Sequence, residues 1–183
     1  MIKDTACPFG ATEFLHKRND TNMEQTEKLQ QARTVYEAMC LAYEKDGLKF
    51  DRHDEDLTIT FGMSGDDLPM EFVVVVIPDA QLVRVYSRLP VTAEEDRRVE
   101  AAMAVVYVNS KILNGSFDLK LENGTISFNV FSAFHGSVPT PELFRYLLGV
   151  AYTTIDRYND RFLMLAKGMI DLQKFMQLCD EDQ

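Results

Sequence analysis

The sequence predicts an α+β fold in which helices cover an antiparallel sheet, in the order α-β-β-β-α-β-β-α. Stretches with apolar residues three and four positions apart lie at the start, the middle and the end of the chain. Between them run shorter segments in which apolar and polar residues alternate, separated by turns that contain glycine, proline or aspartate. The first spacing puts apolar side chains on one face of a helix, and alternation puts them on one face of a strand.

The first helix is predicted to begin at the capping box Thr21-Asn-Met-Glu24, whose side chains accept hydrogen bonds from backbone N–H groups of the first turn. Apolar residues then recur at helical spacing as far as Tyr43, and Asp46-Gly47 supplies a left-handed stop. Residues 1–20 contain a proline and a glycine and show no period, so they are predicted to be an irregular leader. Residues 21–183 are predicted to form a single α+β domain.

A meander of three antiparallel strands is predicted after the first helix. Apolar and polar residues alternate over residues 57–61, and an apolar run follows over residues 70–77. A turn at Pro78-Asp79 then returns the chain through residues 82–87. The second strand is apolar on both faces from residue 72 onward, so it is predicted to be central.

A second helix is predicted after the capping box Thr92-Ala-Glu-Glu95. The run that follows places apolar residues on one side of this helix. The residues on it are Val99, Ala102, Met103, Val106 and Ile112 or Leu113.

The last two predicted strands form a β-hairpin, and a helix closes the chain. Alternation over residues 117–121 and 126–130 flanks Asn123-Gly124, which tolerates the two positive φ angles of a type I′ turn. The helix opens at Thr140-Pro141, with proline at the first helical position, and Gly168 is a point at which it can break.

Charge and cysteine usage limit the partners and the compartment. With 19 basic and 29 acidic residues, the net charge of −10 repels phosphates and anionic lipids, so we expect neither a nucleic acid nor a membrane as partner. No apolar stretch is long enough for a signal peptide or a bilayer span. Cys7, Cys40 and Cys179 are odd in number and lack C-x-x-C spacing, which predicts free thiols and a cytoplasmic location.

No segment predicts a catalytic, cofactor or metal site. His16, His53 and His135 are scattered, with no pair at helical ligand spacing. The acidic residues 51–56 lack the order of a calcium-binding loop, and residues 64–67 lack the glycines and lysine of a phosphate-binding loop. We therefore expect no cofactor, no metal and no enzymatic activity.

The order of elements resembles the type III secretion chaperone fold, and the second half resembles the YbjN family of proposed bacterial sensory-transduction regulators. The residues that carry the likeness are Asn109 in the second helix, the segment 113–117, the hairpin at Asn123-Gly124 and the helix opening at Pro141. The topology matches over residues 21–165, and the sequence over residues 91–161. This resemblance implies a non-enzymatic bacterial cytoplasmic protein, commonly dimeric, that holds another protein, and it offers no catalytic residues.

The central strand holds the candidate partner-binding residues. Helices can cover either Phe72, Val74 and Val76 or the alternate set, and the remaining set must be covered by core or by another protein. Burial of each such side chain stabilises by roughly 1.5–3 kcal/mol, so exposure is costly. We name the alternate set as candidates for partner binding: Val73, Val75 and Ile77.

The favoured function is a homodimeric, chaperone-like or regulatory module that binds a segment of another protein through apolar pockets and sheet edges. The alternative is a small-molecule sensor or an enzyme with a pocket between the sheet and the helices. The residues expected to line that pocket are Met39, Met103, Phe128 and Tyr152.

Overall fold

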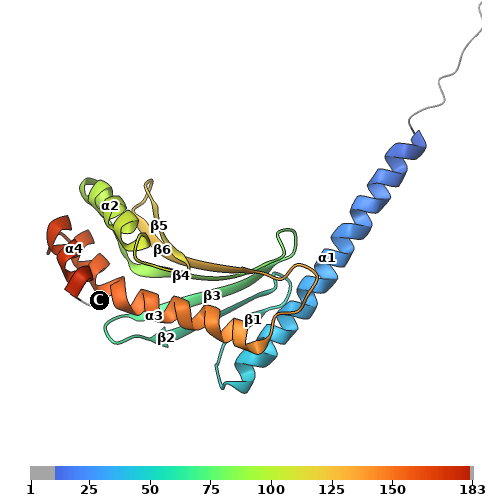
Figure 1. The fold of residues 1–183 in the computed structure, drawn as a ribbon, viewed down its shortest axis with the longest axis horizontal. Helices are drawn as coiled ribbons and strands as arrows, with labels where there is room; N and C mark the ends of the chain where they lie inside the picture. The colour runs from blue at the N-terminus through green and yellow to red at the C-terminus, as the bar shows by residue number, and fades with distance from the viewer. Residues whose placement is uncertain (1–10, 182–183) are drawn as a thin grey trace, which may run out of the picture.

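The computed structural model describes residues 11–181, with side chains from residue 24 onward, and shows an α+β fold (Figure 1). The helices are α1 Ala11–Lys45, α2 Arg98–Asn109, α3 Pro141–Ala166 and α4 Leu172–Glu181, with a 3₁₀ turn Glu95–Arg97 before α2. The strands are β1 Asp51–His53, β2 Thr58–Ser64, β3 Pro69–Ile77, β4 Leu82–Thr92, β5 Ser116–Lys120 and β6 Thr125–Ala133. The predicted fold class is confirmed, and the short strand β1 is an addition to it.

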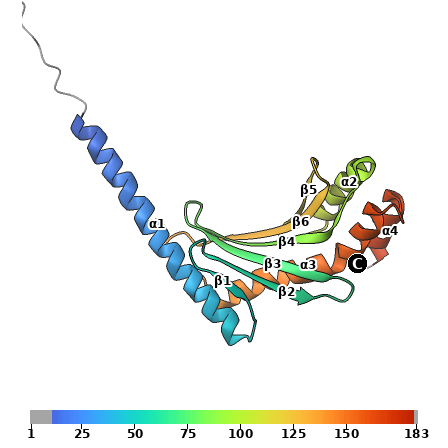
Figure 2. The same ribbon diagram turned by 180° about the vertical axis from the view of Figure 1, so that it is seen from behind.

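The strands form one antiparallel sheet in the order β1-β2-β3-β4-β6-β5. The predicted meander corresponds to β2, β3 and β4, and β3 lies inside the sheet. Figure 1 shows α3 crossing in front of the sheet, and the reverse view in Figure 2 shows the strands in front of α3. One face of the sheet is therefore covered by α3 and the docked part of α1, and no helix within residues 11–181 covers the other face.

The first helix begins earlier than predicted. α1 starts at Ala11, so the prediction that residues 11–20 are irregular is wrong. After Gly10 the sequence contains no glycine or proline before Gly47, and nothing interrupts helical hydrogen bonding ahead of the box at Thr21. The predicted stop is confirmed, since Gly47 has φ +77° and the backbone N–H of Leu48 donates to the carbonyl of Tyr43. The rest of the predicted leader, residues 1–10, lies outside the described residues.

The hairpin β5–β6 forms as predicted, but its turn differs. The strands pair from Lys120 opposite Thr125, which leaves a four-residue loop, and within it only Gly124 has a positive φ, +70°. A Cβ atom at Gly124 would lie 2.0 Å from the carbonyl oxygen of Ala93. The glycine is therefore required by a close approach to the end of β4 rather than by a type I′ turn.

The helices near the C-terminus follow the predicted pattern, whereas the second capping box does not. α3 opens with Pro141 at its first turn and breaks at Gly168, whose φ is +68°, before α4. Thr92 ends strand β4, and α2 begins only at Arg98 without a side-chain cap. A capping box at Thr92 is therefore wrong, because the chain is still paired with β6 at that position.

Candidate protein-binding surfaces

The side chains of β3 alternate between the two faces of the sheet. Phe72, Val74 and Val76 are buried beneath the helices, and the alternate residues are half-buried on the face without a helix. The sequence left open which of the two alternate sets the helices cover, and the structure shows that it is Phe72, Val74 and Val76. The candidates Val73, Val75 and Ile77 all lie on the other side, and their role in partner binding stays a prediction.

The register of the sheet extends this apolar surface across three strands. Val73 lies opposite Tyr86, Val75 opposite Arg84, and Ile77 opposite Leu82. Strand β6 adds Phe131 opposite Arg84 on the far side of β4. We call this surface the outer sheet face; its residues are Val73, Val75, Ile77, Leu82, Arg84, Tyr86 and Phe131.

Arg84 occupies the middle of the outer sheet face. Its guanidinium carbon lies 4.8 Å from the centroid of the Tyr86 ring and 5.5 Å from that of Phe131. Its Nε donates to Oδ1 of Asn129 at 2.7 Å, and Nη2 donates to the same oxygen. The amide nitrogen of Asn129 donates in turn to Oδ2 of Asp118. These contacts fix the guanidinium group beside the sheet.

The second exposed apolar surface lies on α2, on the apolar side that periodicity placed on this helix. Val99, Met103 and Val106 are 72%, 55% and 70% exposed. The buried side carries smaller residues, mostly alanine and valine, because α2 packs closely against β5, α3 and α4. Large apolar side chains therefore point outward, where a monomer gains nothing from them.

These residues form one wall of an apolar groove between α2 and α4, with a volume of about 530 Å³. Among the described residues, no charged side chain lines it. We call it the α2–α4 groove; its lining residues are Val99, Ala102, Met103, Val106 and Tyr107 from α2, Ser110 just after the end of α2, and Leu172 and Met176 from α4.

Polar contacts at both ends of α4 hold the groove in shape. Oδ1 of Asp180 accepts hydrogen bonds from the Tyr107 hydroxyl and from the Lys111 ammonium, each at 2.6 Å. These two donors, Lys111 first, hold the pKa of the Asp180 carboxyl below its ordinary value. At the other end Glu100 accepts a hydrogen bond from the backbone N–H of Leu172 at 2.8 Å. The groove is therefore preformed.

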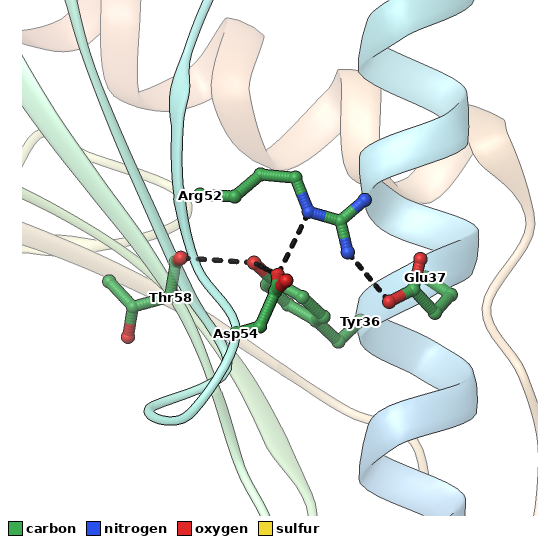
Figure 3. A network of polar contacts seen from close by, with 5 residues as sticks. All are labelled: Tyr36, Glu37, Arg52, Asp54 and Thr58. Atoms are coloured by element: carbon green, nitrogen blue, oxygen red, sulfur yellow. Dashed lines mark hydrogen bonds and ion pairs between the residues drawn. The ribbon is translucent and has the colours of Figure 1, made fainter.

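A third polar cluster ties the edge of the sheet to α1 (Figure 3). Arg52 of β1 donates to Glu37 of α1 at 2.6 Å and to Oδ1 of Asp54 at 2.9 Å. The Tyr36 hydroxyl lies 2.9 Å from the same Asp54 oxygen and 3.2 Å from the carbonyl of Thr58. Burial, followed by the contact with Asp54, raises the pKa of Tyr36, and the hydrogen bond from Arg52 lowers the pKa of Asp54. The acidic segment that sequence analysis interpreted as a turn thus anchors an edge strand.

The histidines and cysteines considered in the sequence analysis contact other protein groups or are buried, where they are described. His53 contacts the Thr60 hydroxyl and His135 contacts Gln81, whereas the side chain of His16 lies outside the described residues. Cys40 and Cys179 are buried free thiols, and burial raises the pKa of Cys40 to about 11. Cys7 lies outside the described residues.

No three His, Cys, Asp or Glu side chains in the described part of the chain come together in a way that could hold a metal ion. Within residues 11–181, no helix has the length and apolarity needed to cross a membrane.

The pocket that the sequence suggested between sheet and helices does not form. Met39 and Phe128 are fully buried in the core, whereas Met103 lines the α2–α4 groove. Tyr152 lies elsewhere, along α3, where its hydroxyl donates to the carbonyl of Ser64. The four predicted lining residues therefore belong to separate places.

The described part of the chain is an α+β fold with a sheet face that none of its helices covers and an apolar groove between α2 and α4. No family model and no curated protein matches the chain. Among solved structures, YbjN from E. coli is similar with a TM-score of 0.51 at 10% identity, over 73% of this chain and 92% of YbjN. The crystal structure of the ExsC–ExsE complex gives a TM-score of 0.48 at 12% identity, over 69% and 92%. The YbjN-like fold predicted from the sequence is thereby confirmed.

Proposed function

We propose that this protein is a homodimeric, non-enzymatic protein-binding module of the bacterial cytoplasm, with a chaperone-like or regulatory role. The observation that carries the proposal is the exposed apolar seam of α2. Its residues Val99, Met103 and Val106 follow one another at intervals of four and three. That spacing is the one by which two helices pack side by side.

The seam supports self-association in particular. Two chains that each carry a net charge of −10 repel one another, so a dimer interface is favoured where charged groups are missing. The α2–α4 groove meets this requirement, and a twofold axis through Met103 brings the same surface of both chains together. Leu172 and Met176 then flank the second α2 helix.

The outer sheet face supports the binding of a different protein. Its residues lie across the neighbouring strands β3, β4 and β6, and no helix of the described residues covers them. Strand β2 also runs four residues beyond its pairing with β1, so in the described structure an edge is open at residues 61–64. An extended segment can pair with such an edge and place side chains on the adjoining face.

The buried thiols support the cytoplasmic part of the proposal. Cys40 and Cys179 lie on α1 and α4, and each is enclosed as a free thiol. Such thiols persist in a reducing compartment.

Dimer formation is tested by light scattering on the purified protein and on Met103→Glu. We expect twice the chain mass for the wild type and a single chain mass for the variant, because a carboxylate would be buried without a partner. Leu41→Glu is the matched control, since Leu41 is 52% exposed on α1, outside the groove. A wild type that is monomeric at micromolar concentration would refute the homodimer.

Partner binding is tested by affinity capture from the host lysate with mass spectrometry. We expect the wild type to retain a stoichiometric protein and Val75→Asp to lose it, because the new carboxylate desolvates unfavourably on the outer sheet face. Leu121→Asp, in the exposed hairpin loop, is the control. Equal retention by the Val75 variant excludes this face, and a wild type that retains nothing contradicts the protein-binding function.

A further inference from the structure

The outer sheet face has a positive charge at its centre, the guanidinium of Arg84, with which no carboxylate of the described residues forms an ion pair. Arg84 is half-buried, and removing a cation from water is costly unless a partner compensates its charge. Its contacts within the described residues are two rings and one amide oxygen, with no carboxylate at ion-pair distance. This absence is notable in a chain with ten more acidic than basic residues.

The neighbouring amide explains how the charge stays both oriented and unneutralised. Asp118 accepts from the nitrogen of the Asn129 amide, so the oxygen of that amide faces Arg84. A carboxylate in place of Asn129 would neutralise the guanidinium, whereas the neutral amide only positions it. The fold thus presents a fixed cation that no carboxylate of the described residues contacts directly.

Donors remain available for a ligand. A guanidinium carries five N–H donors, and here two of them share a single acceptor oxygen. The hydroxyl of Tyr86 makes no hydrogen bond to any described residue. The guanidinium of Arg84 and the neighbouring hydroxyl of Tyr86 can together donate hydrogen bonds to an acceptor group with two oxygens.

Charge and surroundings select the kind of acceptor. Asn129 lies between Asp118 and Arg84 in the hydrogen-bond network. The negative charge of Asp118 therefore lies near the site and disfavours a doubly charged phosphate. Val75 lies on one side of Arg84 and Phe131 on the other, both on the same face. A singly charged carboxylate with apolar groups on either side is therefore the complementary ligand.

We propose that Arg84 selects an Asp or Glu side chain, flanked by apolar side chains, in the polypeptide segment that binds the outer sheet face. This inference rests on the proposed protein-binding function and adds the chemistry of the partner. Arg84 is a specificity residue: the apolar residues around it supply affinity, and the guanidinium decides which segments bind.

The experiment selects peptides from a random display library on the immobilised wild-type protein and measures the best peptide by fluorescence anisotropy. We expect enriched peptides to carry one acidic residue between apolar residues. Replacing that residue by Gln or Asn should weaken binding about tenfold, the scale of a charge-assisted hydrogen bond. In Arg84→Gln the acidic peptide and its amide variant should bind with about equal affinity, a ratio of about one, because the guanidinium that distinguishes them is absent.

Arg88→Gln is the matched control, because Arg88 lies on the same strand and face but is exposed and sits opposite Glu71. It removes the same charge and should leave the acidic preference unchanged. Circular dichroism and thermal unfolding establish that each variant is folded; if Arg84→Gln is not, Arg84→Lys replaces it, and the preference should fall severalfold without the planar fork.

Three results overturn the inference: enrichment of purely apolar peptides, an acidic preference that survives the change at Arg84, or no enrichment at all. The first two leave the protein-binding function intact, because peptides still bind. Failure of the function itself is distinguished by the lysate capture, in which the wild type would retain no protein.

Discussion

The α2–α4 groove and the outer sheet face are both exposed and apolar, but they differ in charge and in what holds them. The groove is lined by uncharged residues and depends on how α4 sits against α2. The face is built on hydrogen-bonded strands and carries Arg84 at its centre. An uncharged surface suits contact between identical acidic chains, whereas a single fixed cation suits discrimination among different partners. A change that displaces α4 should therefore impair the α2–α4 groove and leave the outer sheet face unchanged.

The largest expected effect follows from Phe175→Ala. Phe175 is fully buried on α4, with its ring centroid 5.2 Å from that of Phe162 on α3. Its truncation should lower the free energy of unfolding by about 3–5 kcal/mol and release α4 from the groove. Chemical denaturation measures the stability, and light scattering measures the loss of dimer.

Phe131→Ala is the matched control on the other surface. The Phe131 ring is 46% exposed, so its loss should change the unfolding free energy by less than about 1 kcal/mol and leave the dimer intact. Peptide affinity at the outer sheet face should fall instead. If both variants changed dimerisation equally, the two surfaces would not be independent.

Much of the fold is predictable because its signals are local. The alternation in β2, β4 and the β5–β6 hairpin, and the glycine stop at Gly47, each depend on a few neighbouring residues. Strand β1 was missed because its sequence Asp51-Arg-His53 has no apolar alternation; its pairing with β2 and the contact of Arg52 with α1 hold it.

The two surfaces were harder to predict because burial depends on distant partners. Periodicity located the apolar stripe of α2 but could not tell that smaller residues, such as Ala101 and Ala104, face the core. Arg84 and Asn129 are 45 residues apart and meet only through the register of β4 with β6. The one available signal was a charged residue within the alternating run of residues 82–87, on the same face as Tyr86.

The smallest expected effect is the weakening of the dimer at acidic pH through protonation of Asp180. The pKa of Asp180 is lowered in the folded protein by Lys111 and Tyr107, so its ionised form stabilises the fold above the unfolded pKa, near 3.9. That contribution is lost as the pH falls from about 4 through the lower folded pKa, because the unfolded chain then binds the proton first. Acid should therefore loosen α4 and weaken the dimer, and Asp180→Asn should remove this part of the pH dependence.

The measurement is the dimer dissociation constant as a function of pH, for the wild type and for Asp180→Asn. Asp46→Asn is the matched control: Arg145 likewise lowers the pKa of Asp46, but this pair joins the end of α1 to α3, away from the groove. The control should retain the wild-type pH dependence of dimerisation. An unchanged dependence in Asp180→Asn would show that α4 is seated by its apolar contacts alone, and the contrast between the surfaces would then rest on charge at Arg84 and not on how each is held.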